Sequence, residues 1–295
     1  MENAEALKQR TARLSVISNT LLVLLKLIVG FYSGAVSIIS EAAHSGVDLL
    51  AALIAYYAVR KSSQPPDAQH AYGHGKFENL SAAAEAFLIV LAAIWIMYEA
   101  VEKLASGHAP AYLEYGIAVM LVSIGVNYAV AERLMKVARA TGSQALEADA
   151  IHLKADIWTS AGVLVGLAVI NLTGVNWLDP AIAIVVAVIV LKAGYTMTKK
   201  SLNELTDVSL PPEEEELIGN ILASHPGVIA YHRLRTRRSG CMRHIDVHLI
   251  LHKDMQLDKA HAVCDEIEAA IASALGPCDV VIHLEPCGCH EDFGA

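Results

Sequence analysis

Six long apolar segments fill the 295-residue chain up to residue 198, and they limit what it can fold into. They cover residues 14–34, 36–59, 78–101, 112–134, 143–171 and 178–198. Each can supply the roughly 20 apolar residues that a transmembrane helix needs. The composition agrees, because 55% of the residues are hydrophobic and the mean hydropathy is +0.44. We therefore predict a polytopic α-helical membrane domain of six transmembrane helices over residues 1–206.

The connections between these segments predict the orientation of the chain. Basic residues precede the first segment, follow the second, join the fourth to the fifth and follow the sixth: Lys8, Arg10, Arg13, Arg60, Lys61, Lys76, Arg133, Lys136, Arg139, Lys199 and Lys200. The opposite connections hold one lysine, Lys103. By the positive-inside rule, both termini lie in the cytoplasm and the protein is a multi-pass protein of the inner (plasma) membrane.

From Asp207 onward the composition becomes charged and mixed, which predicts a cytoplasmic domain over residues 207–295. Residues 211–226 and 257–275 have helical patterns, and residues 228–238, 242–252 and 278–286 have strand patterns, so the order is αββαβ. In the second strand, the alternation places Ile245, Val247, Leu249 and Leu251 on one face. The histidines of that strand then lie on the other face.

Charge and cysteine usage exclude several classes of function. The net charge of −9 argues against nucleic-acid binding, which favours a basic face. All five cysteines lie in the predicted cytoplasmic domain, where a reducing compartment favours metal ligation over disulfides: Cys241, Cys264, Cys278, Cys287 and Cys289. The chain contains neither GxxxxGK[ST] nor HExxH, so we expect neither an ATP-driven pump nor an enzyme such as a metalloprotease.

Two apolar segments carry ionisable pairs at the same spacing. The stretch SEAAHSGVDLLAALIAYY contains His44 and Asp48, and the fifth segment contains His152 and Asp156. Residues i and i+4 share a helix face, and ionisable residues in lipid mark ion pathways. If the two faces meet, two imidazoles and two carboxylates form a set that suits a tetrahedral divalent ion, zinc before Fe²⁺, Co²⁺ and Ni²⁺. The alternative is a pair of interhelical hydrogen bonds, but the repeated residue types and spacing favour metal.

Three further ionisable residues lie near these pairs, at Glu41, Asp149 and Lys154. Because they are closer to the helix ends, we expect them to snorkel or to face water, and not to act as ligands.

The chain resembles the cation diffusion facilitators, a family of dimeric divalent-metal/proton antiporters. HSGVD, HLKAD, DAQHAYGHGKFE and VIHLEP carry the resemblance. It implies a ferredoxin-like cytoplasmic domain, and a membrane metal site formed by His44, Asp48, His152 and Asp156. Zinc/cadmium exporters of the family carry aspartate where His44 stands, so the resemblance is closer to the zinc-selective members.

The resemblance also implies further metal sites. One lies in the loop after the second segment, although a solvated polar loop is the alternative: Asp67, His70 and His74. Another is an interfacial, binuclear site of the cytoplasmic domain: His232, His248, His261, His283 and Glu285. Cys287, Cys289 and His290 form a C-x-C-H tail outside the family pattern. We include them as candidate ligands, with an ordinary thiol tail as the alternative.

These observations predict a Zn²⁺/H⁺ antiporter that exports zinc from the cytoplasm as a homodimer, with Zn²⁺ both transported and regulatory. Its partners are then the lipid bilayer, divalent ions and protons, with no nucleic acid. Two alternatives stay open: an exporter of Fe²⁺, Cd²⁺, Co²⁺ or Ni²⁺, and a membrane metal sensor or scaffold that does not transport. Such a sensor predicts a damaged set of membrane ligands, whereas this set is complete.

Overall fold

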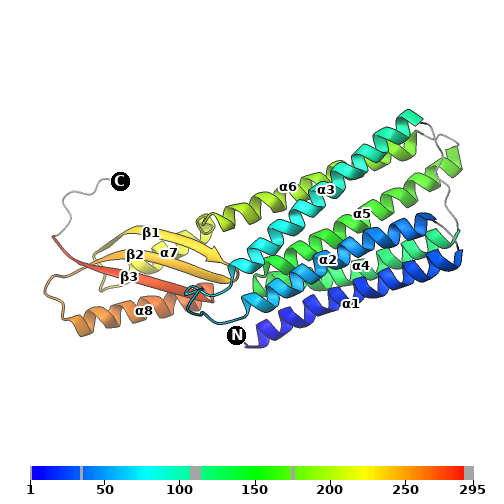
Figure 1. Cartoon of the computed structure of the whole chain (residues 1–295). Coiled ribbons are helices and arrows are strands. Elements are labelled where there is room, and N and C mark those ends of the chain that lie inside the picture. The colour runs from blue at the N-terminus through cyan, green and yellow to red at the C-terminus, as the bar shows by residue number, and fades with distance from the viewer. Residues whose placement is uncertain (1, 34–35, 107–113, 174–176, 289–295) are drawn as a thin grey trace. The chain divides into compact units, whose positions relative to one another are not determined.

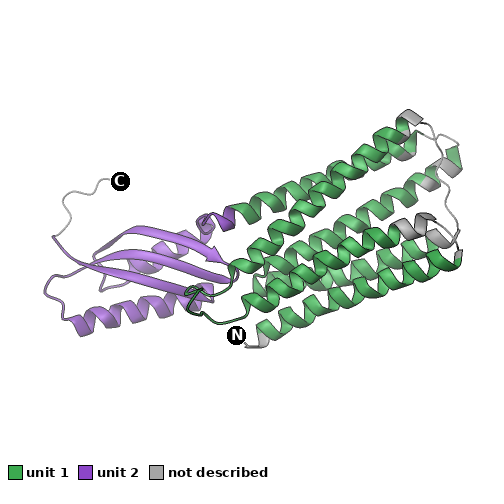
Figure 2. Ribbon diagram, viewed as in Figure 1, with its two compact units in different colours: residues 1–202 green, residues 203–295 purple. Residues whose placement is uncertain are grey.

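The computed structural model of the chain describes residues 2–33, 36–106, 114–173 and 177–288 (Figure 1). The chain divides into two compact units, residues 1–202 and residues 203–295 (Figure 2).

Six long helices make up the first part of the chain: α1 (Glu2–Ser33), α2 (Val36–Ser62), α3 (Lys76–Ser106), α4 (Glu114–Thr141), α5 (Gln144–Thr173) and α6 (Leu178–Leu205). Within the described residues, all except α5 are long and apolar enough to cross a membrane. The first half of α5 carries four charged residues: Glu147, Asp149, Lys154 and Asp156. The membrane-helix fold predicted from the sequence is confirmed, and composition marks five of the six helices as spans.

Small side chains allow these helices to pack closely. One buried cluster joins α1, α2, α4 and α5 through residues that include Ala12, Val59, Leu134 and Ala150. At Gly194 of α6 an added Cβ would lie 2.9 Å from the Val90 side chain of α3, so no larger residue fits there without a shift. Close backbone approach through small residues is typical of membrane helices, where packing drives association.

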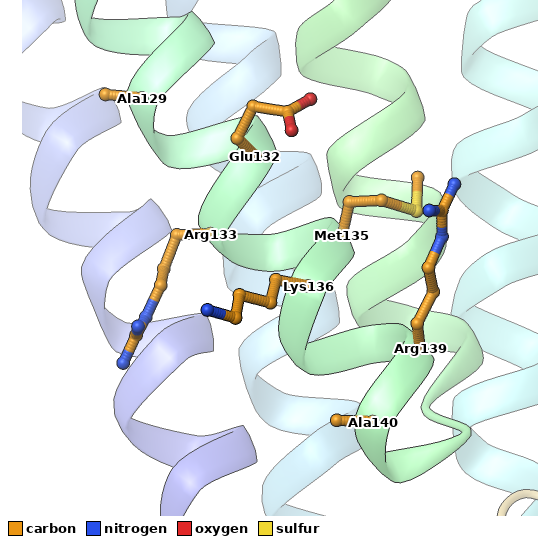
Figure 3. Close-up of a pocket in the computed structure, with 7 residues that line it drawn as sticks. All are labelled: Ala129, Glu132, Arg133, Met135, Lys136, Arg139 and Ala140. Carbon is orange, nitrogen blue, oxygen red and sulfur yellow. The ribbon is translucent and has the colours of Figure 1, made fainter.

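The fourth helix is longer than the sequence predicted. It continues to Thr141, so Arg133, Lys136 and Arg139 lie on its last turns and not in a segment that joins two helices. Arginine and lysine are good helix formers, and the helix stops only where Gly142 adopts a φ of +68°. Figure 3 shows these basic side chains around a pocket on α4, together with Glu132.

A buried polar network connects four of the helices. The Nζ atom of Lys8 in α1 lies 3.0 Å from Oε1 of Glu78 in α3, and their side chains are 3% and 1% exposed. The hydroxyls of Ser62 in α2 and of Ser143, which directly precedes α5, also donate hydrogen bonds to the Glu78 carboxylate. This carboxylate is therefore well compensated although it is buried.

After the end of α6, the described residues of the second unit form two helices and a three-stranded sheet: α7 (Pro212–Ser224), β1 (Ala230–Ser239), β2 (Met242–Leu251), α8 (Leu257–Leu275) and β3 (Cys278–Pro286). The strand order is β1-β2-β3, with β1 antiparallel and β3 parallel to β2. The predicted αββαβ order is confirmed.

One face of this sheet is the core of the unit. Ile245, Val247, Leu249 and Leu251 of β2 are at most 4% exposed and pack with apolar residues of α7 and α8. The alternation of β2 therefore has the predicted phase, which leaves its histidines on the face away from that core.

Candidate metal sites

Helices α2 and α5 bring together the four predicted membrane ligands. His44, Asp48 and Asp156 offer ligand atoms that all lie within 4.8 Å of one another. The Nε2 atom of His152 lies 3.2 Å from Oδ1 of Asp48 and 3.9 Å from Oδ2 of Asp156. We call these four residues the membrane quartet. Because each pair has i, i+4 spacing, contact between the two helix faces is enough to assemble it.

The chemistry of the membrane quartet fits a divalent ion. The side chains of His152, Asp48 and Asp156 are 6%, 7% and 16% exposed, whereas His44 is exposed. Oδ2 of Asp156 is buried and has no hydrogen-bond partner, which is uncommon for a polar atom in a folded protein. A cation would satisfy this oxygen, and two nitrogen and two oxygen donors suit tetrahedral zinc.

One expectation for the neighbouring residues is wrong. Asp149 does not face water, because it is 1% exposed. The reason is tertiary, because other helices cover the first turns of α5, including α1 with Ser15 beside Asp149. Lys154 is partly exposed and forms a 2.8 Å ion pair with Glu132 of α4.

The sequence reasoning also missed a buried acid, Glu85 of α3, which is 0% exposed. It accepts a hydrogen bond from Ser81 and lies within electrostatic range of Asp149 and His152. A signal was available, because Glu85 is the one charged residue between Glu78 and Glu99 in an otherwise apolar segment.

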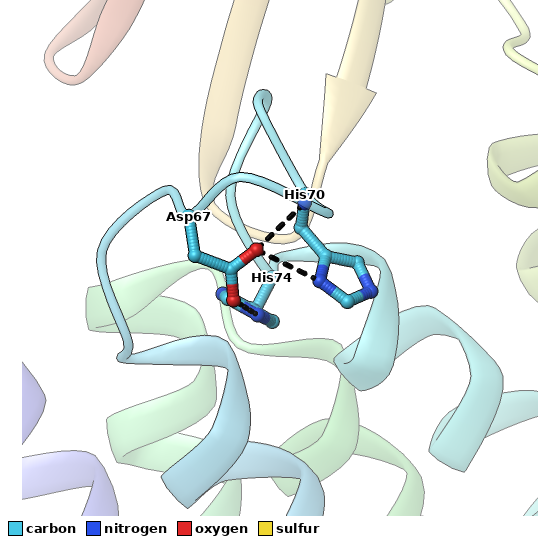
Figure 4. A group of neighbouring side chains, drawn as sticks. All are labelled: Asp67, His70 and His74. Carbon is cyan, nitrogen blue, oxygen red and sulfur yellow. Dashed lines mark hydrogen bonds and ion pairs between the residues drawn. The ribbon is translucent and has the colours of Figure 1, made fainter.

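The three predicted loop ligands lie side by side between α2 and α3 (Figure 4). Oδ1 of Asp67 accepts hydrogen bonds from the backbone N–H groups of Gln69 and His70. Its carboxylate oxygens also lie 3.2 Å from the His70 and His74 rings. The two imidazole centroids are 4.5 Å apart. One carboxylate and two imidazoles therefore point to a common place.

Hydrogen bonding sets the charge state of this loop. The backbone N–H of His70, with smaller contributions from Gln69 and the His70 ring, lowers the pKa of Asp67 to about 2. Asp67 is thus ionised at any physiological pH, as a metal ligand must be. Gly73 has a φ of +81°, which few other residues tolerate, and this lets the chain turn back before His74.

In the second unit, strand register explains how three histidines meet. His248 of β2 is paired with His232 of β1 and with His283 of β3. Directly paired residues share a face of the sheet, and Glu285 shares it too because it lies two residues beyond His283. The imidazole centroids are 5.1 Å apart for His232 and His248, and 4.6 Å apart for His248 and His283.

Glu285 is the centre of this group and is 9% exposed. Its oxygens lie 2.9 Å from His232, 2.7 Å from His248 and 3.8 Å from His283. His261 is not brought into the group. It lies on α8 with a 77% exposed side chain, and Asp265 is 3.9 Å away.

The cysteine tail is described only in part. Cys287 is a free, exposed cysteine whose backbone N–H donates to the carbonyl of Leu251. Cys289 and His290 lie outside the described residues. A metal site of the C-x-C-H tail therefore stays a prediction.

The sequence matches two family descriptions along nearly its whole length. Residues 12–206 match the cation efflux transmembrane domain, and residues 210–287 match the cytoplasmic domain of cation efflux proteins. The chain belongs to the cation efflux family. It is therefore a membrane protein and a divalent metal cation efflux transporter, and the resemblance to the cation diffusion facilitators is confirmed.

Two relatives match nearly the whole chain, and a solved structure matches a smaller part of it. The cation-efflux pump FieF of Escherichia coli O127:H6 is 34% identical over 281 residues, which is 95% of this chain and 93% of that protein. The FieF pump of Cronobacter sakazakii is 33% identical over 281 residues, with the same coverage. A solved structure of CzrB in its zinc form covers 28% of this chain and 97% of its own, at 36% identity and a TM-score of 0.27.

Proposed function

We propose that this transporter exports Zn²⁺ from the cytoplasm in exchange for protons, as a homodimer of the inner membrane. The observation that carries the proposal is the convergence of His44, Asp48, His152 and Asp156 inside the helical unit. Two imidazoles and two carboxylates favour zinc over harder ions, which prefer sets made of oxygen alone, and over softer ions, which prefer thiolates.

Exchange for protons follows from the ligand chemistry. A metal ion binds neutral imidazole and ionised carboxylate, so its binding displaces protons from the quartet. After the ion is released, protons bind to the ligands again. The protonated site can then return to face the cytoplasm. Alternating exposure of a fixed site between two groups of helices would then couple the two flows.

The distribution of basic residues supports cytoplasmic termini. Arg133, Lys136 and Arg139 lie at the end of α4 that leads into α5 (Figure 3), and Lys8, Arg10 and Arg13 lie in the first half of α1. In the cytoplasmic orientation these residues lie beside the negatively charged inner leaflet.

The group around Glu285 is proposed to bind regulatory zinc. In a dimer, the two acidic cytoplasmic domains can lie in more than one arrangement. Zinc at this site would stabilise the arrangement that has the highest affinity for zinc. The loop group at Asp67 is proposed as a lesser site for the same ion. Neither group lies in the helices that hold the membrane quartet.

The test is flux through the purified chain in proteoliposomes. Metal entry and proton movement are recorded together for Zn²⁺, Cd²⁺, Fe²⁺ and Mn²⁺, each at several proton gradients. We expect Zn²⁺ to give the highest flux and every metal flux to be matched by opposite proton movement. Faster Fe²⁺ than Zn²⁺ transport would overturn the choice of zinc, and zinc flux that ignores the proton gradient would overturn antiport.

A further inference from the structure

A lysine lies inside the membrane unit close to the membrane quartet. Lys26 of α1 is 6% exposed, in a helix that is otherwise long and apolar enough to cross the membrane. Its Nζ atom donates to the hydroxyl of Ser45 at 2.7 Å and to Oε2 of Glu41 at 3.2 Å, both in α2. A cation at this depth is costly, and it is kept in membrane proteins mainly where it has a function.

The partners of Lys26 lie on the quartet's own helix face. Glu41, Ser45 and Asp48 follow one another at i, i+4 and i+7 along α2, so they form one stripe. The ammonium also acts electrostatically on Asp156 of α5. Ser45, which Lys26 contacts, is next to His44 in the chain and one helical turn before Asp48, so Glu41 and Ser45 hold the ammonium beside the α2 half of the quartet.

The charges in this region thus fall into two groups, those of the quartet itself and those of the residues beside it. Asp48 and Asp156 carry the two carboxylates of the quartet itself, and Lys26 and Glu41 add one positive and one negative charge beside it. A divalent ion in the quartet is repelled by the ammonium and attracted by the Glu41 carboxylate. Neither residue needs to touch the ion for its charge to change the affinity, because interactions between charges are long-ranged in a medium of low dielectric.

We propose that Lys26 is a tethered counter-cation that sets the metal affinity of the membrane quartet, with Glu41 as its restraint. It balances the quartet carboxylates when no ion is bound, and it weakens ion binding so that the ion can leave. This inference rests on the proposed function of the quartet. It predicts that removing the charge of Lys26 and removing the charge of Glu41 change the zinc affinity in opposite directions. A simple interhelical contact predicts no such difference.

The test measures zinc binding to the full chain in detergent by calorimetry. We call Asp67, His70 and His74 the loop group, and His232, His248, His283 and Glu285 the sheet group. A background protein with H70A, H74A, H248A, H283A, C287S, C289S and H290A removes ligands from the loop group, the sheet group and the C-x-C-H tail. The membrane quartet is then the one candidate site with all of its ligands. In that background we compare K26M, K26R and E41Q, with K192M as the matched control, because Lys192 is an exposed lysine of α6. Circular dichroism and the elution volume show that each variant is folded.

We expect K26M to bind zinc roughly tenfold more tightly. E41Q should bind zinc more weakly, by a smaller factor, because the Glu41 side chain is 48% exposed and solvent screens its charge. K26R keeps the positive charge, and K192M changes a lysine on another helix. Both variants should therefore bind zinc as tightly as the background protein. In flux assays K26M should release the ion more slowly. E41Q and K26R are conservative, so they keep the test decisive if K26M does not fold.

Unchanged or weaker binding by K26M would overturn the proposal, and so would changes of the same sign in K26M and E41Q. Failure of the proposed function has a different signature. If D156N in the background leaves the zinc stoichiometry unchanged, the quartet is not the binding site, whatever the Lys26 variants show.

Discussion

Replacing Glu78 by glutamine should destabilise the membrane unit by about 3 kcal/mol, near the lower end of the cost of breaking a buried ion pair. The Glu78 side chain is 1% exposed, and its carboxylate binds Lys8, Ser62 and Ser143 from three other parts of the unit. Glutamine keeps the shape and one acceptor oxygen, so the loss is mostly that of the charge facing Lys8.

The assay is unfolding in mixed micelles, titrated with a denaturing detergent and followed by tryptophan fluorescence. E147Q is the matched control, because Glu147 forms an ion pair with Lys200 nearer the surface. The Glu147 side chain is 30% exposed and the Lys200 side chain is 43% exposed. An exposed pair is worth at most about 1 kcal/mol. The double variant K8M/E78Q should recover part of the stability, since it leaves no ammonium opposite the neutral amide. If E78Q lowers the free energy of unfolding by no more than E147Q does, the reasoning is refuted.

Three further predictions concern the metal sites. H44D should raise the ratio of Cd²⁺ to Zn²⁺ flux, because it replaces a nitrogen donor with oxygen and recreates the set of zinc/cadmium exporters; an unchanged ratio would place selectivity elsewhere. H248A with H283A should weaken the zinc-induced approach of distance labels on the two cytoplasmic domains and should slow flux without abolishing it; complete loss of flux with normal closure would contradict this. The pKa of Asp67 is lowered to about 2, so its contribution to loop stability is full above pH 3.8 and is lost as the pH falls through about 2. The amide signal of His70 should therefore titrate near pH 2, and a midpoint near 3.8 would contradict the hydrogen bonding.

The membrane quartet could be predicted because its signal is local. His44 with Asp48, and His152 with Asp156, are unusual residues at a spacing that fixes a common face, so only the meeting of two helices had to be assumed. The sheet group was predictable for a related reason. Alternation in β2 places His248 away from the core, and the family pattern supplied its neighbours.

Burial of the remaining polar residues could not be predicted in the same way. Asp149 lies near a helix end, where a side chain often reaches water, but the structure covers that end with other helices. The ion pair of Lys26 with Glu41 depends on how α1 packs against α2. No spacing within one helix contains that information. His261 shows the converse, because its residue type fits a metal site while its place on α8 keeps it apart from the sheet group.

The most direct test of zinc transport through the membrane quartet is zinc flux by D48A and D156A in proteoliposomes. Each variant removes one of four ligands, and the loop and sheet groups stay intact as internal controls for folding and metal binding. The account predicts folded dimers with no zinc flux and no zinc-driven proton movement. Wild-type flux in either variant would contradict it.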